Sequence, residues 1–331
     1  MPNDVITRVA VVGAGTLGAQ IAALCAAGGA ATVVTDVSPE ALERARGRIG
    51  SELLPAIAAA GMGTRSAAEA FAGLAFEPDV EAAVRGVDLV VEAVKEDAAV
   101  KTELFGRLSR ANPTAILATN SSSIPSSRIV GEVADPSRVC NAHFFGPIWV
   151  RTMVELMSCG ATDPAVLDRL KAFTDGLGLV TAIVRTESKG FIINRIWRAV
   201  KRESLAVVDQ GVAEPEDVDR LWRIFFQTDY PPFGVMDMVG LDVVRDIETS
   251  YQRESLDPTD VPSATLERMI GAGLLGEKTG RGFYAHPDPA YLRDDFVRPA
   301  TAGDASAESG GEDGSANRST GVGSPGDESP G

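Results

Sequence analysis

The sequence predicts an α/β fold in which a doubly wound, mostly parallel sheet is followed by an all-α C-terminal domain. From residue 8 to residue 184, short apolar runs alternate with helix-like segments. Runs that are apolar at nearly every position are typical of strands buried on both faces of a parallel sheet. After residue 186 only helical patterns follow. We therefore expect a sheet domain over residues 1–186 and a helical domain over residues 187–298.

The first elements of the sheet domain form a strand–helix–strand unit. Residues 8–12 (RVAVV) read as a strand, an alanine-rich helix follows, and residues 31–35 form a second strand that ends at Asp36. Ser38 and Pro39 are a suitable N-cap and first-turn proline for a helix that extends to about residue 60. Further strands are expected at 74–76, 87–91, 115–119, 139–145, 153–157 and 180–184, and helices at 78–84, 97–110 and 164–177.

The helical domain and the tail differ in composition. Helices are expected at 191–210, 214–226, 241–256 and 264–270. The segment 299–331 is instead rich in Gly, Ser, Ala and acidic residues, with almost no large apolar side chain. Such a segment buries too little apolar surface to offset its ordering entropy. We therefore expect residues 299–331 to be a disordered acidic tail.

Charge and cysteine content restrict the classes of partner. The chain has 331 residues and a net charge of −15, with no basic stripe, so neither nucleic acid nor an anionic membrane is an expected partner. No apolar run approaches membrane-spanning length, and the N-terminus has no secretion-signal pattern. The 3 cysteines, at positions 25, 140 and 159, show no metal-ligand spacing and indicate free thiols. We expect a cytoplasmic protein that needs no metal.

A glycine-rich turn lies between the first strand and the first helix. Gly13, Gly15 and Gly18 form the pattern G-x-G-x-x-G, with Leu17 inside it. The first glycine permits a tight turn, the second lets a pyrophosphate approach the backbone, and the third lets the helix pack closely on the strand. Asp36, at the end of the next strand, is placed to accept hydrogen bonds from ribose hydroxyls and to repel a 2′-phosphate. The pattern therefore predicts NAD rather than NADP as the cofactor.

One of the 2 histidines stands in an apolar segment beside a bend. His143 is followed by Gly146 and Pro147, and then by a second apolar run that contains Glu155. Two strands joined by this bend would bring the imidazole and the carboxylate together, and such a pair accepts a proton near pH 7. A lone histidine in an apolar strand is, however, more often a hydrogen-bonded core residue. The remaining motifs decide between the two interpretations.

Several motifs together resemble the 3-hydroxyacyl-CoA dehydrogenase family. They are GAGTLG at 13–18, VVEAVKED at 90–97, ATNSSSI at 118–124, AHFFGP at 142–147, GFIINR at 190–195 and GEKTGRGFY at 276–284. Their order and spacing also match, and the similarity extends to about residue 286. The resemblance implies an NAD-binding domain of the Rossmann type and a helical domain that commonly mediates homodimerisation. It also implies an active site in the cleft between the two domains.

The resemblance implies roles for individual residues. His143 is similar to the general base that removes the proton of the substrate's 3-hydroxyl, and Glu155 to the carboxylate that orients this base. Ser122 is similar to the serine that hydrogen-bonds the reacting oxygen, and Asn194 to the asparagine that positions the base and the substrate. The residues similar to cofactor contacts are Glu96, Lys101 and Lys278. The implied reaction is oxidation by NAD of a 3-hydroxyacyl thioester, by default on CoA, to the 3-oxoacyl thioester, or the reverse.

Composition alone also allows simpler interpretations. Ser122 lies in a turn-forming stretch, and Asn194 is a suitable polar position on an amphipathic helix. Lys101 and Lys278 would equally serve as solvated surface charges. His286 is expected at the surface.

The chain departs from the family pattern near the expected substrate site. The family usually has Asn at the position of Gly146 and Pro at the position of Lys189, and the loop here continues with Trp149 and Arg151. The missing side chain at Gly146 would reshape the pocket, and Arg151 would either meet an anionic group of the substrate or form a structural ion pair. Between residues 37 and 94, where the family binds CoA, the chain has no lysine.

These departures leave other functions open. The hydroxyacyl group would then be carried by an acyl carrier protein, or the substrate would be a free hydroxy acid. A non-catalytic NAD-binding protein is the remaining alternative.

Overall fold

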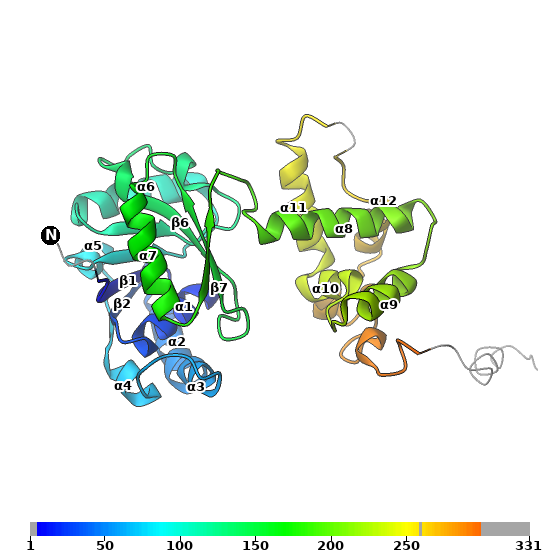
Figure 1. The fold of residues 1–331 in the computed structure, drawn as a ribbon, viewed down its shortest axis with the longest axis horizontal. Coiled ribbons are helices and arrows are strands. Elements are labelled where there is room, and N and C mark those ends of the chain that lie inside the picture. Colours follow the sequence, from blue (N-terminus) through cyan, green and yellow to red (C-terminus); the bar gives the residue numbers. More distant parts are fainter. Residues whose placement is uncertain (1–4, 258–259, 299–331) are drawn as a thin grey trace, which may run out of the picture. The chain divides into compact units, whose positions relative to one another are not determined.

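The computed structural model describes residues 5–257 and 260–298 (Figure 1). The chain divides into two compact units, Met1–Arg198 and Ala199–Gly331. The division falls within helix α8 (Ile193–Asp209), later than the boundary expected at residue 186. The cause is local, because the N–H groups of Ile192 and Ile193 are hydrogen-bonded to Glu155 in the sheet. The tail expected to be disordered, 299–331, lies outside the described residues.

The first unit is built on an eight-stranded sheet with the strand order β3-β2-β1-β4-β5-β6-β7-β8. The strands are β1 (Arg8–Val12), β2 (Ala31–Thr35), β3 (Leu74–Phe76), β4 (Leu89–Glu92), β5 (Ile116–Thr119), β6 (Val139–Phe144), β7 (Met153–Ser158) and β8 (Val180–Val184). Neighbouring strands are parallel except β6 and β7, which are antiparallel. The order reverses between β1 and β4, and ligands of such sheets bind at the carboxyl ends of the strands there. The predicted doubly wound, mostly parallel sheet is thus confirmed.

Alternate residues of each central strand face two separate apolar cores. Val9 and Val11 face the core that contains α1 (Thr16–Ala27), whereas Ala10 and Val12 face the core that contains α6 (Ala98–Ala111). A strand buried on both faces has no polar side, which explains the continuous apolar runs in the sequence.

The other helices of the first unit largely follow local capping signals. They are α2 (Pro39–Arg48), α3 (Leu54–Ala59), α4 (Ala67–Ala72), α5 (Val80–Val84) and α7 (Pro164–Gly176). Ser38 caps α2 by accepting the N–H of Ala41, and a π-helical stretch, η1 (Ile49–Leu53), joins α2 to α3. Helix α4 was not expected, although a capping box formed by Ser66 and Glu69 starts it.

The second unit is helical, as predicted. Besides most of α8 it contains α9 (Pro215–Phe226), α10 (Pro232–Val239), α11 (Leu241–Gln252) and α12 (Ala264–Gly271). Helix α10 was not expected, because PPFGVMDMV contains two prolines and a glycine and lacks a helical apolar period. Within the described ranges, no helix is long and apolar enough to cross a bilayer.

Two buried carboxylates organise the second unit. Asp219 accepts hydrogen bonds from two backbone N–H groups of α10 and from the hydroxyl of Tyr284. Asp237 accepts the N–H groups of Phe283 and Tyr284 and lies 3.2 Å from Nε2 of His286. The expectation that His286 lies at the surface is therefore wrong. Its side chain is 5% exposed, because it is paired with Asp237.

Candidate active site

The glycine turn lies at the carboxyl end of β1 and leads directly into α1. Gly13 has a φ of +107° and donates its N–H to the carbonyl of Thr35 at 2.8 Å. A Cβ at Gly18 would lie 1.9 Å from the carbonyl oxygen of Gly13, whereas a Cβ at Gly15 would meet nothing within 4 Å. The first and third glycines are thus required by the turn and its packing, and Gly15 leaves the backbone open to a ligand. This arrangement suits a pyrophosphate at a helix N-terminus.

Asp36 stands directly beside this turn. Its Oδ2 accepts the N–H of Ala14 at 2.7 Å, and its Oδ1 accepts the N–H of Ser38 at 2.9 Å. The adjacent cavity, of about 470 Å³, is lined by Gly15, Asp36 and the apolar side chains of Val37, Val80, Val100 and Leu104. Apolar walls with a carboxylate at the end of β2 fit an adenosine, with its ring between apolar side chains and its ribose hydroxyls at Asp36. The residues present therefore fit NAD.

A second cavity brings together five of the residues singled out in the sequence of the first unit. Its volume is about 260 Å³, and Leu17, Glu96, Lys101, Ser122 and His143 are among the residues that line it. It shares two lining residues, at positions 93 and 94, with the adenosine cavity. Ser122 is exposed in the loop after β5, so its hydroxyl is accessible to a ligand.

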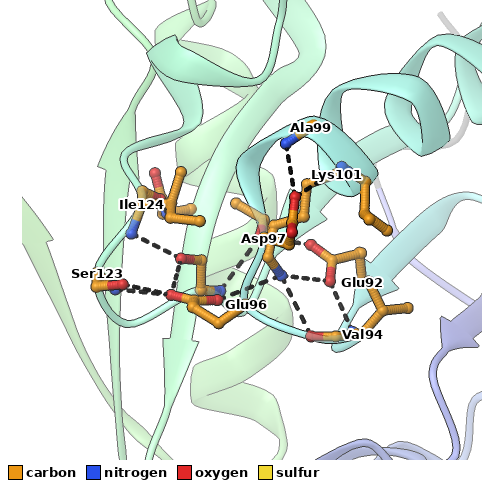
Figure 2. Close-up of polar contacts among 12 residues, drawn as sticks. Glu92, Val94, Glu96, Asp97, Ala99, Lys101, Ser123 and Ile124 are labelled. Carbon is orange, nitrogen blue, oxygen red and sulfur yellow. Dashed lines mark hydrogen bonds and ion pairs between the residues drawn. The ribbon is translucent and has the colours of Figure 1, made fainter. Parts of the chain in front are cut away.

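Lys101 belongs to a buried ion-pair network beside this cavity (Figure 2). Its Nζ lies 2.6 Å from Oε1 of Glu92 and 3.5 Å from Oε2 of Glu96. The side chains of Lys101 and Glu92 are 1% and 0% exposed. Glu92 also accepts the N–H of Val94 at 2.7 Å and the hydroxyl of Thr119 at 2.6 Å. Lys101 thus places a buried positive charge at the wall of this cavity.

Glu96 supports the serine loop after β5. Its Oε1 accepts the hydroxyls of Ser121 and Ser123 at 2.5 and 2.7 Å and the N–H of Ser123 at 3.0 Å (Figure 2). Burial raises the pKa of the Glu96 carboxyl, but the two hydroxyls and the charge of Lys101 outweigh it, and the net pKa is lowered. Glu96 is therefore a carboxylate at neutral pH, and it holds the loop that presents Ser122.

His143 and Glu155 face each other across the antiparallel pair β6–β7. They are directly opposite in the strand register, and Nδ1 of His143 lies 3.0 Å from Oε2 of Glu155. The two residues are 5% and 2% exposed. Because a carboxylate only accepts hydrogen bonds, Nδ1 carries the proton and Nε2 is the nitrogen that remains for a substrate. The other oxygen of Glu155 accepts the N–H groups of Ile192 and Ile193 at 3.0 and 2.9 Å.

The remaining predicted residues lie in different places. Asn194 is half-buried in the first turn of α8, directly after the two N–H groups that bind Glu155. Lys278 belongs to the second unit, where it forms an ion pair with Asp242. Trp149 packs against the apolar core, and Arg151 donates a hydrogen bond to the carbonyl of Gly146. Arg151 thus braces its own loop.

Sequence reasoning missed two polar residues of the site. Gln20 is 5% exposed in α1, and its Oε1 accepts the N–H of Ile148 at 3.1 Å, which ties the loop after His143 to the cofactor helix. A Cβ at Gly146 would lie 3.4 Å both from this Oε1 and from Cδ1 of Leu17. Glu92 is the second polar residue of the site that was not predicted. Both carried a signal, because each is a polar residue within an otherwise apolar helix or strand.

The fold and the site define an NAD-dependent oxidoreductase that acts on an alcohol group. Oxidation of an alcohol needs a hydride acceptor, which the glycine turn and Asp36 are built to hold, and a proton acceptor near it. The imidazole of His143, paired with Glu155, is the candidate for this acceptor.

Comparison with known proteins identifies the family. Residues 8–188 match the NAD binding domain of 3-hydroxyacyl-CoA dehydrogenase, and residues 190–286 match its C-terminal domain. The chain is 35% identical over 287 residues to 3-hydroxybutyryl-CoA dehydrogenase of Mycobacterium tuberculosis H37Rv, covering 86% of this chain and 100% of the relative. It therefore belongs to the 3-hydroxyacyl-CoA dehydrogenase family, as its motifs indicated.

Two further relatives show the range of this similarity. The solved structure of (S)-3-hydroxybutyryl-CoA dehydrogenase from Ralstonia eutropha has a TM-score of 0.79 at 29% identity and covers 86% of this chain and 100% of that one. The chain is also 29% identical to 5-formyl-3-hydroxy-2-methylpyridine 4-carboxylate 5-dehydrogenase of Mesorhizobium japonicum, over 85% of this chain and 91% of the relative.

Proposed function

We propose that the protein oxidises the 3-hydroxyl of a 3-hydroxyacyl thioester, carried on coenzyme A, to the 3-oxo group, or catalyses the reverse reaction. The observation that carries the proposal is the contact of 3.0 Å between Nδ1 of His143 and Oε2 of Glu155, because His143 also lines the cavity that contains Ser122. Bound NAD supplies the hydride acceptor. The names of the relatives support a 3-hydroxyacyl group on CoA as the substrate.

In this mechanism Nε2 of His143 takes the proton from the hydroxyl oxygen while a hydride leaves the carbon that bears this hydroxyl. Glu155 keeps the proton on Nδ1 and stabilises the imidazolium that forms. The hydroxyl of Ser122 hydrogen-bonds the reacting oxygen, and Asn194 positions the substrate beside the base. Glu96 and Lys101, which line the same cavity, act on the bound cofactor.

The test follows NADH absorbance with 3-hydroxybutyrate presented free, on CoA and on an acyl carrier protein. We expect the highest kcat/KM with the CoA thioester. His143→Gln should lower kcat by about 10²–10⁴-fold, because an amide cannot take the proton, while the Kd for NAD stays unchanged. Wild-type inactivity with all three substrates, despite NAD binding, would refute the function and favour a non-catalytic protein.

Two alternative substrates keep the same chemistry. A carrier-protein thioester presents the same reacting group as CoA, and preference for it in this assay would replace CoA. A free hydroxy acid is supported by the relative named for a pyridine carboxylate and by Arg151, which is exposed in the loop between β6 and β7. If the free acid is preferred, Arg151→Ala should abolish activity. With a CoA thioester the same change should have a small effect, because the guanidinium already donates to Gly146.

A homodimer formed through the second unit is part of the proposal. Helix α9 exposes a run of large apolar side chains, with Leu221, Ile224, Phe225 and Phe226 exposed by 66, 52, 80 and 54%. An apolar patch of this kind on a charged protein is typical of a permanent interface. Phe225→Asp should convert the dimer to a monomer in sedimentation equilibrium. A wild-type monomer at micromolar concentration would refute the assignment.

We propose a reducing, cytoplasmic compartment for the protein. Cys25, Cys140 and Cys159 are buried free thiols. Burial raises the pKa of Cys25 and of Cys140 to about 12, so these thiols are unreactive at neutral pH.

A further inference from the structure

The turn that precedes α8 has an unusual backbone. Gly190 and Phe191 have φ values of +78° and +53°, and Phe191 is one of two non-glycine residues with positive φ in the described ranges. A bulky side chain is disfavoured in this left-handed region, so the surrounding structure must hold it there. Phe191 is 3% exposed, and its N–H donates to the carbonyl of Ser188 at 3.1 Å.

The left-handed turn delivers two donors to one atom. Directly after Phe191, the N–H groups of Ile192 and Ile193 both point to Oε1 of Glu155, at 3.0 and 2.9 Å. A carboxylate that is 2% exposed is stable only when hydrogen bonds replace its water. The left-handed residue directly before these two N–H groups sets the direction in which the chain enters α8.

The side chain of Phe191 meets the other half of the pair. Its ring centroid lies 4.9 Å from that of His143, with an interplanar angle of 32°. The ring of Phe145 lies 4.2 Å from the same imidazole, at 52°. The imidazole is thus held by two aromatic rings in addition to its hydrogen bond with Glu155.

We propose that Phe191 is a positioning residue for proton transfer, acting through both its backbone and its ring. Its left-handed backbone supplies Glu155 with two donors, and its ring fixes the plane of the His143 imidazole. The inference rests on the proposed function, since it assigns Phe191 to the pair that the function uses. This role explains why a bulky residue is kept at a positive φ, which packing of the ring alone does not explain.

The test separates the backbone from the ring with two variants of similar size. Phe191→Asn removes the ring but tolerates the left-handed backbone, whereas Phe191→Val removes the ring and disfavours that backbone. We expect kcat to fall about 10-fold in Phe191→Asn and at least about 100-fold in Phe191→Val, as a misplaced base loses its contribution. KM for the hydroxyacyl substrate and Kd for NAD should stay within about twofold of wild type.

A double variant distinguishes positioning from general stability. In a His143→Gln background, Phe191→Val should lower kcat no further, because the base that it positions is absent. If Phe191→Val does not fold, Phe191→Asn and Phe191→Gly decide, and both should keep KM and NAD binding while kcat falls about 10-fold.

Three results would overturn the proposal: equal kcat in the Asn and Val variants, wild-type kcat in the Asn and Gly variants, or an additive loss in the double variant. Failure of the proposed function is a separate result, seen as the absence of turnover in the wild type.

Discussion

Replacing Lys101 by Met would test the buried network beside the candidate active site. Methionine has a similar length and is apolar, so the change removes the ammonium without opening a large cavity. It leaves the carboxylate of Glu92, which is 0% exposed, without its cation. Removal of one partner of a buried ion pair typically costs about 3–5 kcal/mol, because the other charge stays buried and uncompensated.

The remaining contacts of Glu92 determine how much stability the Lys101→Met variant loses. The carboxylate keeps two donors, the N–H of Val94 at 2.7 Å and the hydroxyl of Thr119 at 2.6 Å. The lost contact to Glu96 is the weaker one, at 3.5 Å to a partly exposed group. We therefore expect Lys101→Met to lower the free energy of unfolding by about 3 kcal/mol, near the lower limit of the range.

The assay is urea denaturation followed by circular dichroism, together with a double-mutant cycle. The double variant Glu92→Met, Lys101→Met removes both charges and should be more stable than Lys101→Met alone. It should remain about 1–2 kcal/mol below wild type, because the two donors of Val94 and Thr119 lose their acceptor. A loss below about 1 kcal/mol in the single variant, or additive losses in the cycle, would contradict this reasoning.

Three further predictions concern the cofactor, the substrate loop and pH. Asp36→Ala should raise the KM for NAD at least about tenfold, since it removes a charged acceptor; initial rates at varied NAD measure it, and an unchanged KM would exclude the ribose contact. Gln20→Met should lower the free energy of unfolding in urea by about 1–2 kcal/mol, because the N–H of Ile148 loses its acceptor, whereas Gln20→Glu retains one and should lose less. Burial raises the pKa of Asp219 from 3.8 to about 6. The native state therefore binds this proton more tightly than the unfolded chain does, and the resulting stabilisation is complete below pH 4. This contribution to the free energy of unfolding, about 3 kcal/mol, is lost as the pH rises through 6. The difference in melting temperature between wild type and Asp219→Asn should shift over this interval, and a constant difference would refute the assignment.

The predictable parts of the fold are those determined by interactions between residues close in sequence. The unit from β1 to β2 follows from three glycines, an apolar helix and Asp36, each acting on residues near it in sequence. For the pair of His143 and Glu155, the sequence predicted the two strands but not their register. The bend at Gly146 indicated two strands, but a shift of one residue in register would have turned Glu155 to the other face of the sheet. The register that sets His143 opposite Glu155 is established by packing on both faces.

The parts that could not be predicted depend on contacts between distant segments. Thr119, on β5, and Lys101, on α6, meet Glu92 on β4, and no local pattern joins these positions. The same holds for Asp237, whose burial turns His286 from an expected surface residue into an interior one. A polar residue inside an apolar strand or helix was the only sequence signal of these contacts, and it does not identify the partner.

The position of His143 and Glu155 within paired strands also bears on how this enzyme can evolve. Because the strand register sets the two side chains opposite each other, a change of an exposed side chain in the loop between them leaves both in place. Gly146, Trp149 and Arg151 all lie in that loop. Side chains of this loop can therefore differ between related proteins while His143 and Glu155 keep their pairing.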